Sequence, residues 1–557
     1  MYGLPTTTIA KTTLTSASDT VTLDIDTSAL SFSGGENDNP RHLIIRMNPR
    51  STATTGGVYM RFNGDTGNNY NYGDIYGHET TEAYEFREDV TRFWVGMAVN
   101  DTGEYSVGEW IVPDAFSTRG HKTLLGMSGR DHGNYGIEAI GGRWANTAAL
   151  TSVTFWGDGT NFDTNSYFEL AVVDESYSIY ESINTGAANF DKSSISAGDG
   201  DLVIVGSLKS TQGTVEELAI AFNNDTTASN YWRQRLNGHQ AEVAARANAE
   251  NLIGHTAGGS GNHAEAFYGL VGMVPQYSDT TTNGDRQMIA LAGGHSSDDS
   301  AGDDNKSEIA ATALRWDNTS AINRVKVYGK NGDTFVADSM LSIYKVPKGL
   351  ITRTELTSDT SSITFSSIPD TYDHLELSGY SRSASASTSD GIEMHFTPDG
   401  GSVDSTVSNY YLQWFYGEGN TDSAGTENND DFAYGPADNA DSNVFAAWTV
   451  FIPNYRLTDR HKTSFTHMGF GDANDETYSL LNTRRWANTA EIDAITLTQA
   501  SGSNFKAGTI VELRGVNATV VAPTSDVKKL SSITQASVKK INGIAAGSIK
   551  KLNTVEF

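Results

Sequence analysis

At 557 residues the chain is too long for a single hydrophobic core and predicts several domains. Its formal net charge of −29 disfavours a body that binds nucleic acid or an anionic membrane by electrostatic attraction, and the absence of cysteine excludes disulfides and thiolate metal sites. Aromatic residues make up 10% of the chain, beside many Gly, Ser, Thr, Asn and Asp residues, which argues against disorder and favours short strands joined by turns.

The first residues, MYGLPTTTIAKTTLTSASDT, contain no basic segment followed by an apolar core, so we expect no secretory signal. No apolar stretch approaches the length that spans a bilayer. The expectation is a soluble protein without membrane insertion, made in the cytoplasm.

One sequence block recurs three times at nearly constant spacing. RWANTAALTSVTF begins at Arg143, RWDNTSAINRVKV at Arg315 and RWANTAEIDAITL at Arg485. The tryptophans of the block lie 172 and 170 residues apart, at Trp144, Trp316 and Trp486. A fixed period of this kind is the signature of a repeated unit, so we predict three copies of one unit of about 170 residues.

A β-hairpin is predicted to close each unit. Apolar residues after each tryptophan share one face of a strand, and a turn rich in Gly, Asn and Asp then leads to a second apolar strand. The turn ends at an equivalent phenylalanine in each copy: Phe162, Phe335 and Phe505. Earlier blocks recur in the same order, among them three apolar strands that end in Asp-bearing turns, at Asp65, Asp225 and Asp399.

The predicted fold class is all-β: three tandem antiparallel β-sandwich domains of jelly-roll-like form, followed by a short repetitive tail. The expected boundaries are 1–175, 176–347, 348–521 and 522–557. A β-propeller is disfavoured because its repeat is only about 40 to 50 residues long. One short helix is expected from Ala241 to Asn251, where the other two units are expected to have a loop.

The tail repeats with a period of 11 residues, as VKKLSSI, VKKINGI and IKKLNTV. From Pro523 to Phe557 six lysines against two acidic residues give a net charge of +4, opposite in sign to the body. Asn542-Gly543 is a strong turn signal, so short strands joined by turns are expected. We predict an assembly anchor that docks on other proteins, with these candidate residues: Val527, Lys528, Val538, Lys539, Ile541, Ile544, Ile549, Lys550 and Leu552.

The sequence contains few signals of catalysis. No histidine pair has the HExxH spacing of a zinc site, and no GxSxG nucleophile elbow occurs. The Asp-bearing turns lack the spacing of an EF-hand loop, and Asp is also a common turn residue, although calcium binding by these turns stays open. We therefore predict no enzyme activity, no catalytic residue, no metal and no cofactor.

Two kinds of aromatic residue stand out. Because Trp144, Trp316 and Trp486 precede the same strand in every unit, a structural corner is favoured over a cation–π or sugar-stacking site. Aromatic residues in the central stretches, where the three copies differ from one another, are instead candidates for stacking on sugar faces. These candidate glycan contacts are Tyr70, Tyr72, Tyr76, Tyr411, Trp414 and Tyr416.

The RWANT block, its strand, the turn that ends at Asn161-Phe162 or Asn504-Phe505, and the closing strand resemble a module of virion proteins of tailed bacteriophages, in particular marine and cyanobacterial ones. The VKKINGI repeat also looks like a terminal element of phage structural proteins. The resemblance covers the ends of all three units and the tail, and it implies a structural protein without carrying over any catalytic residue.

The leading hypothesis is a tail fibre or tail-associated appendage of a phage virion, in which three sandwiches project outward and attach to host-surface polysaccharide. The protein is then expected to be a homo-oligomer, localised to the virion, and not to bind nucleic acid. The alternatives are a capsid head-decoration protein and a carbohydrate-binding or carbohydrate-active protein.

Overall fold

The computed structural model describes most of the chain. The described residues are 2–26, 41–132, 135–183, 186–198, 200–212, 216–239, 242–256, 266–280, 284–295, 307–346, 351–472 and 477–516, with 540–541, 544–545, 551–552 and 555–556 in the tail. They form antiparallel β-strands, three short 3₁₀ turns and no α-helix, so the all-β prediction is confirmed for this part of the chain. The 3₁₀ turns are η2 (Glu175–Tyr177), η3 (Ala228–Asn230) and η4 (Val407–Asn409).

The first unit contains twelve strands. They are β1 (Thr6–Thr13), β2 (Thr20–Asp24), β3 (Leu43–Asn48), β4 (Thr55–Phe62), β5 (Tyr70–His78), β6 (Thr81–Val90), β7 (Phe93–Val99), β8 (Val107–Val112), β9 (Lys122–His132), β10 (Tyr135–Trp144), β11 (Ser152–Gly157) and β12 (Tyr167–Val173).

The second unit repeats this series. Its strands are β13 (Ser178–Ile183), β14 (Asn189–Lys192), β15 (Asp201–Leu208), β16 (Glu216–Phe222), β17 (Tyr231–His239), β18 (Glu242–Asn248), β19 (Leu252–Thr256), β20 (Tyr268–Val274), β21 (Arg286–His295), β22 (Ser307–Trp316), β23 (Val325–Gly329) and β24 (Met340–Val346).

The third unit repeats it again. Its strands are β25 (Thr352–Glu355), β26 (Ser362–Phe365), β27 (His374–Ser381), β28 (Ser389–Pro398), β29 (Tyr410–Glu418), β30 (Thr421–Glu427), β31 (Asp431–Pro436), β32 (Ala446–Ile452), β33 (Lys462–Phe470), β34 (Tyr478–Trp486), β35 (Ile492–Gln499) and β36 (Ile510–Val516).

Each unit has one eight-stranded and one four-stranded sheet, and the strand order is the same in all three. In the first unit the orders are β1-β12-β3-β8-β9-β10-β5-β6 and β2-β11-β4-β7. Side chains from both sheets share one hydrophobic core, in which Phe62 and Phe155 of the small sheet lie with Trp110 and Leu170 of the large one. The second and third units have equivalent cores.

The predicted closing hairpin is wrong. Strand β11 pairs with β2 and β4 in the four-stranded sheet, whereas β12 pairs with β1 and β3 in the eight-stranded sheet. The connection between them carries Phe162, which is buried and bridges Ser18 and Ser51 as the chain crosses from one sheet to the other. Alternating apolar residues reveal which face of a strand is buried but not which strand it pairs with.

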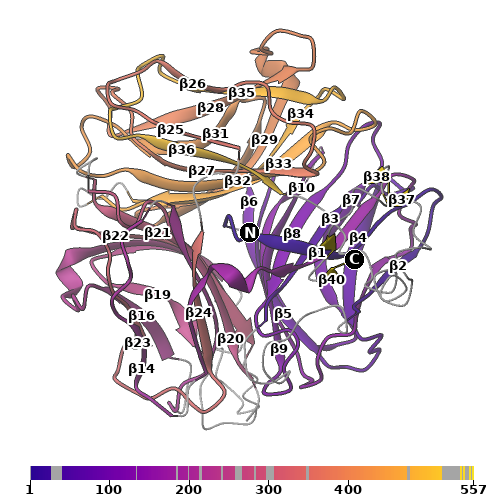
Figure 1. The fold of residues 1–557 in the computed structure, drawn as a ribbon, viewed down its shortest axis with the longest axis horizontal. Coiled ribbons are helices and arrows are strands. Elements are labelled where there is room, and N and C mark those ends of the chain that lie inside the picture. The colour runs from indigo at the N-terminus through magenta and orange to yellow at the C-terminus, as the bar shows by residue number, and fades with distance from the viewer. Residues whose placement is uncertain are drawn as a thin grey trace.

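The three units do not project outward as a linear array. Figure 1 shows them in purple, magenta and orange around a common centre. The equivalent strands β9, β21 and β33 contact one another there, and side chains such as Leu125, Leu291 and Phe465 join one shared core. Neighbouring residues on the same strands, such as Leu124 and Met288, face the core of their own unit. These strands are therefore buried on both faces.

An equivalent glycine in each unit shows that the contacts run around a ring. A Cβ on Gly77 of the first unit would lie 2.7 Å from Phe415 of the third, and one on Gly238 of the second would lie 2.1 Å from Tyr84 of the first. A Cβ on Gly417 of the third unit would lie 3.0 Å from Ala245 of the second. The same surface of each unit therefore packs on the next one, and the rotation closes, as in a cyclic trimer.

The predicted helix from Ala241 to Asn251 is also wrong. Residues Glu242–Asn248 form strand β18, which pairs with β17 along its length and is equivalent to β6 and β30. The alanines favour a helix in isolation, but pairing at the edge of the large sheet overrides this weak preference.

In the tail, β37 (Lys540–Ile541) pairs with β38 (Ile544–Ala545), and β39 (Lys551–Leu552) pairs with β40 (Val555–Glu556). Three of the anchor candidates, Ile541, Ile544 and Leu552, belong to these short strands. The other six lie outside the described residues: Val527, Lys528, Val538, Lys539, Ile549 and Lys550.

Candidate functional site

A cleft in the first unit combines aromatic rings with carboxylates. Its volume is about 340 Å³, and we call it the first-unit cleft. Strand β5 supplies alternate residues to it, and β4, β6, β7 and β10 supply the rest. Its lining is Tyr59, Tyr72, Asp74, Tyr76, Gly77, His78, Glu85, Arg87, Trp94, Met97, Gly136 and Glu138.

The pKa values of two carboxyl groups in this cleft are raised. Asp74 is only 5% exposed and accepts no hydrogen bond from the described residues. Burial, followed by repulsion from Glu138, raises the pKa of Asp74 well above its usual value. Burial also raises the pKa of Glu138 to about 6, although Nε1 of Trp94 donates to its Oε2 at 2.9 Å. The remaining acid, Glu85, is exposed and accepts a 2.8 Å hydrogen bond from Arg87.

Aromatic rings complete the walls. Tyr59 and Trp94 meet edge to face with ring centroids 5.3 Å apart. Tyr72 is 8% exposed and Tyr76 is half-buried, and burial raises the pKa of both hydroxyls. The cleft therefore presents apolar ring surface next to two poorly compensated acids.

The equivalent places in the other two units have different chemistry. A smaller cleft of about 140 Å³ in the third unit is lined by Trp414, Tyr416 and Asp431 among others, and the first two rings stack at 5.0 Å. Burial and the charge of Glu393 raise the pKa of Asp431 to about 7. In the second unit the residue equivalent to Asp74 is Arg235.

The candidate glycan contacts fall into three groups. Tyr72 and Tyr76 line the first-unit cleft, and Trp414 and Tyr416 line the third-unit cleft. Tyr411 is half-buried and lies outside both clefts, with the guanidinium of Arg485 5.9 Å from its ring centre. Tyr70 is fully buried and its hydroxyl donates to the carbonyl of Asp65, so it is a core residue.

The repeated tryptophans are buried at the ends of equivalent strands. Their indole Nε1 atoms donate to an Asp carboxylate at 2.7, 3.0 and 2.9 Å in the three units. The acceptors are Asp65, Asp225 and Asp404, respectively. The third acceptor is not Asp399, which the sequence pattern selects and which is exposed, because the turn is five residues longer in this unit. A backbone N–H of each turn donates to the other carboxylate oxygen, and the side-chain amide of Asn69, Asn230 or Asn409 donates to the same oxygen as the indole.

We expect Asp404→Ala to destabilise the chain by about 1–3 kcal/mol, because it leaves the buried indole N–H of Trp486 without a partner. Partial burial raises the pKa of Asp404, but hydrogen bonds from Trp486 and Asn409 outweigh it, so the pKa lies below its usual value. The contribution of this carboxylate is therefore present at neutral pH and is lost as the pH falls through the lowered pKa. Urea unfolding of the parent and the variant from pH 7 to 3 measures the free energy of unfolding, and the difference between the two proteins should shrink towards acid pH.

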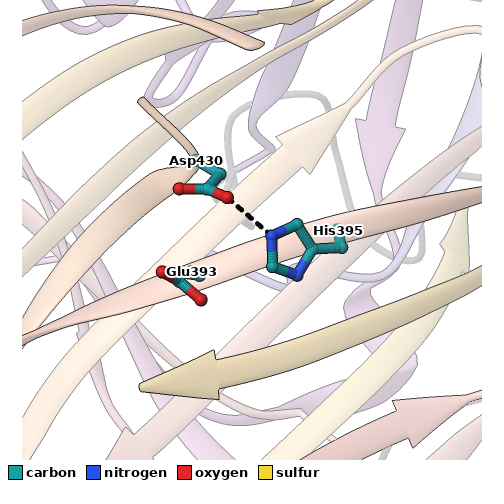
Figure 2. Close-up of side chains that lie close together, drawn as sticks. All are labelled: Glu393, His395 and Asp430. Atoms are coloured by element: carbon teal, nitrogen blue, oxygen red, sulfur yellow. Dashed lines mark hydrogen bonds and ion pairs between the residues drawn. The ribbon is translucent and has the colours of Figure 1, made fainter. Parts of the chain in front are cut away.

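A histidine–carboxylate cluster in the third unit gives no sequence signal. Figure 2 shows Glu393 and His395 on β28 beside Asp430, with His395 Nε2 2.7 Å from Asp430 Oδ2. One ligand atom from each residue lies within 4.8 Å of the others, a spacing that fits a metal ion. Glu393 already accepts a hydrogen bond from Thr498, and the His395 interaction lowers the pKa of Asp430 against the effect of burial. The cluster is thus a connected polar network on the outer face of the small sheet.

Comparisons with known proteins identify no relative. No family model matches the chain, and no curated protein matches it. Solved structures that align include Pseudomonas aeruginosa OccK5 (OpdH), at 8% identity over 84% of this chain and 99% of that chain, with a TM-score of 0.09. Acinetobacter baumannii OccAB4 aligns at 8% identity over 84% and 100%, also with a TM-score of 0.09. Similarity this low carries no argument about fold or function.

No helix among the described residues is long and apolar enough to cross a membrane.

Proposed function

We propose that each unit is a jelly-roll sandwich. Eight strands of the first unit support this, because they lie in the orders β1-β12-β3-β8 and β2-β11-β4-β7. In chain order these strands alternate between the two sheets, except that β4 and β7 are neighbours in the smaller one. All neighbours in the sheets are antiparallel, which is the pattern of two Greek keys. Strands β5, β6, β9 and β10 then extend the larger sheet beyond the jelly roll.

The proposed function is that of a non-enzymatic structural component of a phage virion, with its units closed into a covalent pseudo-trimer. The observation that carries it is the ring of three units with one topology around a shared core. Jelly rolls form viral capsid proteins and lectin domains, and a closed ring presents three related surfaces without needing separate chains to assemble. We also propose that the units end near residues 175, 347 and 521 and that the protein is located in the virion.

A fibre or tail-associated appendage and a head-decoration protein share this architecture. Imaging of antibody-labelled particles of the virus that encodes the chain separates them. A few copies at the tail support the appendage, and tens to hundreds of copies on the head support decoration. Absence of the chain from purified particles would refute the virion assignment.

Deleting Pro523 to Phe557 tests the proposed anchor. These residues carry a net charge of +4 and lie beyond the last strand of the third unit, so the body should keep its fold and its melting temperature. We expect the truncated chain to be lost from particles and from complexes with other virion proteins. Normal incorporation of the truncated chain would contradict the anchor.

Attachment to host-surface saccharide is the second proposed function. It is supported by the two clefts, where aromatic rings suited to stacking on sugars lie beside carboxylates that accept hydrogen bonds from hydroxyl groups. Incubating the protein with host polysaccharide tests two proposals at once. Retention of the protein supports attachment, and depolymerisation would contradict the non-enzymatic assignment.

A further inference from the structure

We propose that the first-unit cleft binds an organic ammonium group, held by the carboxylates of Asp74 and Glu138 against the aromatic walls. The biological role of this binding rests on the proposed saccharide attachment, for which an amino sugar is the matching ligand. The binding itself depends only on the geometry of the cleft.

The first argument is a buried acid that no hydrogen bond from the described residues compensates. Asp74 is 5% exposed, lines the cleft and receives no hydrogen bond from the described residues. Glu138 receives a hydrogen bond from Nε1 of Trp94. The charges of Arg87 and Arg130 partly offset the two acids, but Arg87 is exposed and paired with Glu85, and Arg130 lies outside the lining. A buried acid without a partner is unfavourable, and a bound cation that donates hydrogen bonds removes that penalty.

The second argument comes from the second unit, which contains its own cation at the equivalent place. Counting from the matched tyrosines Tyr70 and Tyr231, Arg235 corresponds to Asp74. Arg235 is 5% exposed and lies 3.6 Å from Glu308, which also approaches His255 at 2.5 Å. The second unit therefore has a cation paired with an acid at this place, whereas the first unit has an acid there.

The third argument is the aromatic wall. Tyr59, Tyr72, Tyr76 and Trp94 all line the cleft, and cations are attracted to the faces of such rings. A volume of about 340 Å³ is at the lower end of small-ligand sites and accommodates a single amino sugar. A neutral sugar would use the rings but would leave the two acids uncompensated.

The test is isothermal titration of the full chain at pH 7 with glucosamine hydrochloride and, separately, with glucose. These ligands differ only in the replacement of one hydroxyl by an ammonium group. We expect glucosamine to bind at least about tenfold more tightly than glucose. Equal affinities would overturn the ammonium proposal while supporting a neutral-saccharide site, and no binding of either would overturn both.

Two variants localise the site. Asp74→Asn keeps the shape of the side chain and should keep the fold, yet it removes the acid and should weaken glucosamine binding at least about tenfold with little effect on glucose. Asp399→Asn makes the same change at an exposed residue of the third unit and should leave binding unchanged. Equal effects of the two variants would mean general attraction of a cation to this acidic protein, and would overturn the proposal. Thermal melting of each variant verifies its fold.

Discussion

Arg514→Ala should be among the most destabilising single substitutions in the chain, with an expected loss of about 3–5 kcal/mol. The guanidinium of Arg514 is 4% exposed and donates to Asp201 of the second unit at 3.0 Å and to Ser378 at 2.8 Å. It also contacts Glu512. Its removal leaves buried carboxylates facing each other across the boundary between the second and third units. Chemical unfolding of the variant and the parent chain at pH 7 measures the loss.

The stability lost on Arg514→Ala should be smaller at low pH than at neutral pH. Burial and the nearby charge of Asp201 already raise the pKa of Glu512, and loss of the guanidinium raises it further. A group whose pKa is raised on folding stabilises the folded state in its protonated form, at low pH. The difference between variant and parent should therefore shrink as the pH is lowered from 7 towards 5.

Lys330→Ala is the matched control for Arg514→Ala. Lys330 pairs with Glu217 at 2.6 Å, but the side chains are 41% and 32% exposed, so its removal should cost less than about 1 kcal/mol. Equal losses for the two variants would show that the boundary between the units is open to water, and would contradict the closed ring.

Phe451→Ala should cost a similar amount, about 3–5 kcal/mol, because it opens a cavity in the shared core. Phe451 of the third unit is 2% exposed, and its ring centre lies 5.5 Å from those of Phe465 and His374. The guanidinium of Arg46, from the first unit, lies 5.6 Å from the same ring centre. The cavity therefore weakens both the third unit and its contact with the first.

Calorimetry tests whether the three units unfold together or independently. Because all three units contribute to the shared core, Phe451→Ala should lower the whole unfolding transition. A separate early transition of the third unit, with the rest unaffected, would contradict a shared core. Phe86→Ala is the control: this residue is 41% exposed on β6, and its loss should change stability by less than about 0.5 kcal/mol.

The all-β class could be predicted because strands leave a signal in the local order of residues. Leu150, Val153 and Phe155 are buried as their pattern indicates, and so are their equivalents in the other units. Strand partners leave no such signal, which explains why β11 and β12 were wrongly assigned to one hairpin. The same limitation applies to β18, whose alanine-rich sequence indicates a helix until β17 pairs with it.

The sequence predicts aromatic residues of the candidate clefts but not their acids. Tyr72, Tyr76, Trp414 and Tyr416 stand out as clustered aromatic residues, and all four line clefts. Tyr70 belongs to the same cluster, but it lies at the start of β5, where its ring is fully buried and a turn carbonyl accepts its hydroxyl, so it is a core residue. Asp74 and Glu138 gave no signal, since nothing local indicates that β5 and β10 are neighbours.

Three copies of one β-rich unit and a basic tail are evident from the order of residues alone, because repetition and side-chain alternation are local properties of the chain. The closure of the copies into a ring around a shared core, and the pair of acids in the aromatic cleft of one copy, are evident only in the folded protein. Both depend on contacts between residues far apart in the chain, and these are set by how sheets pair and pack.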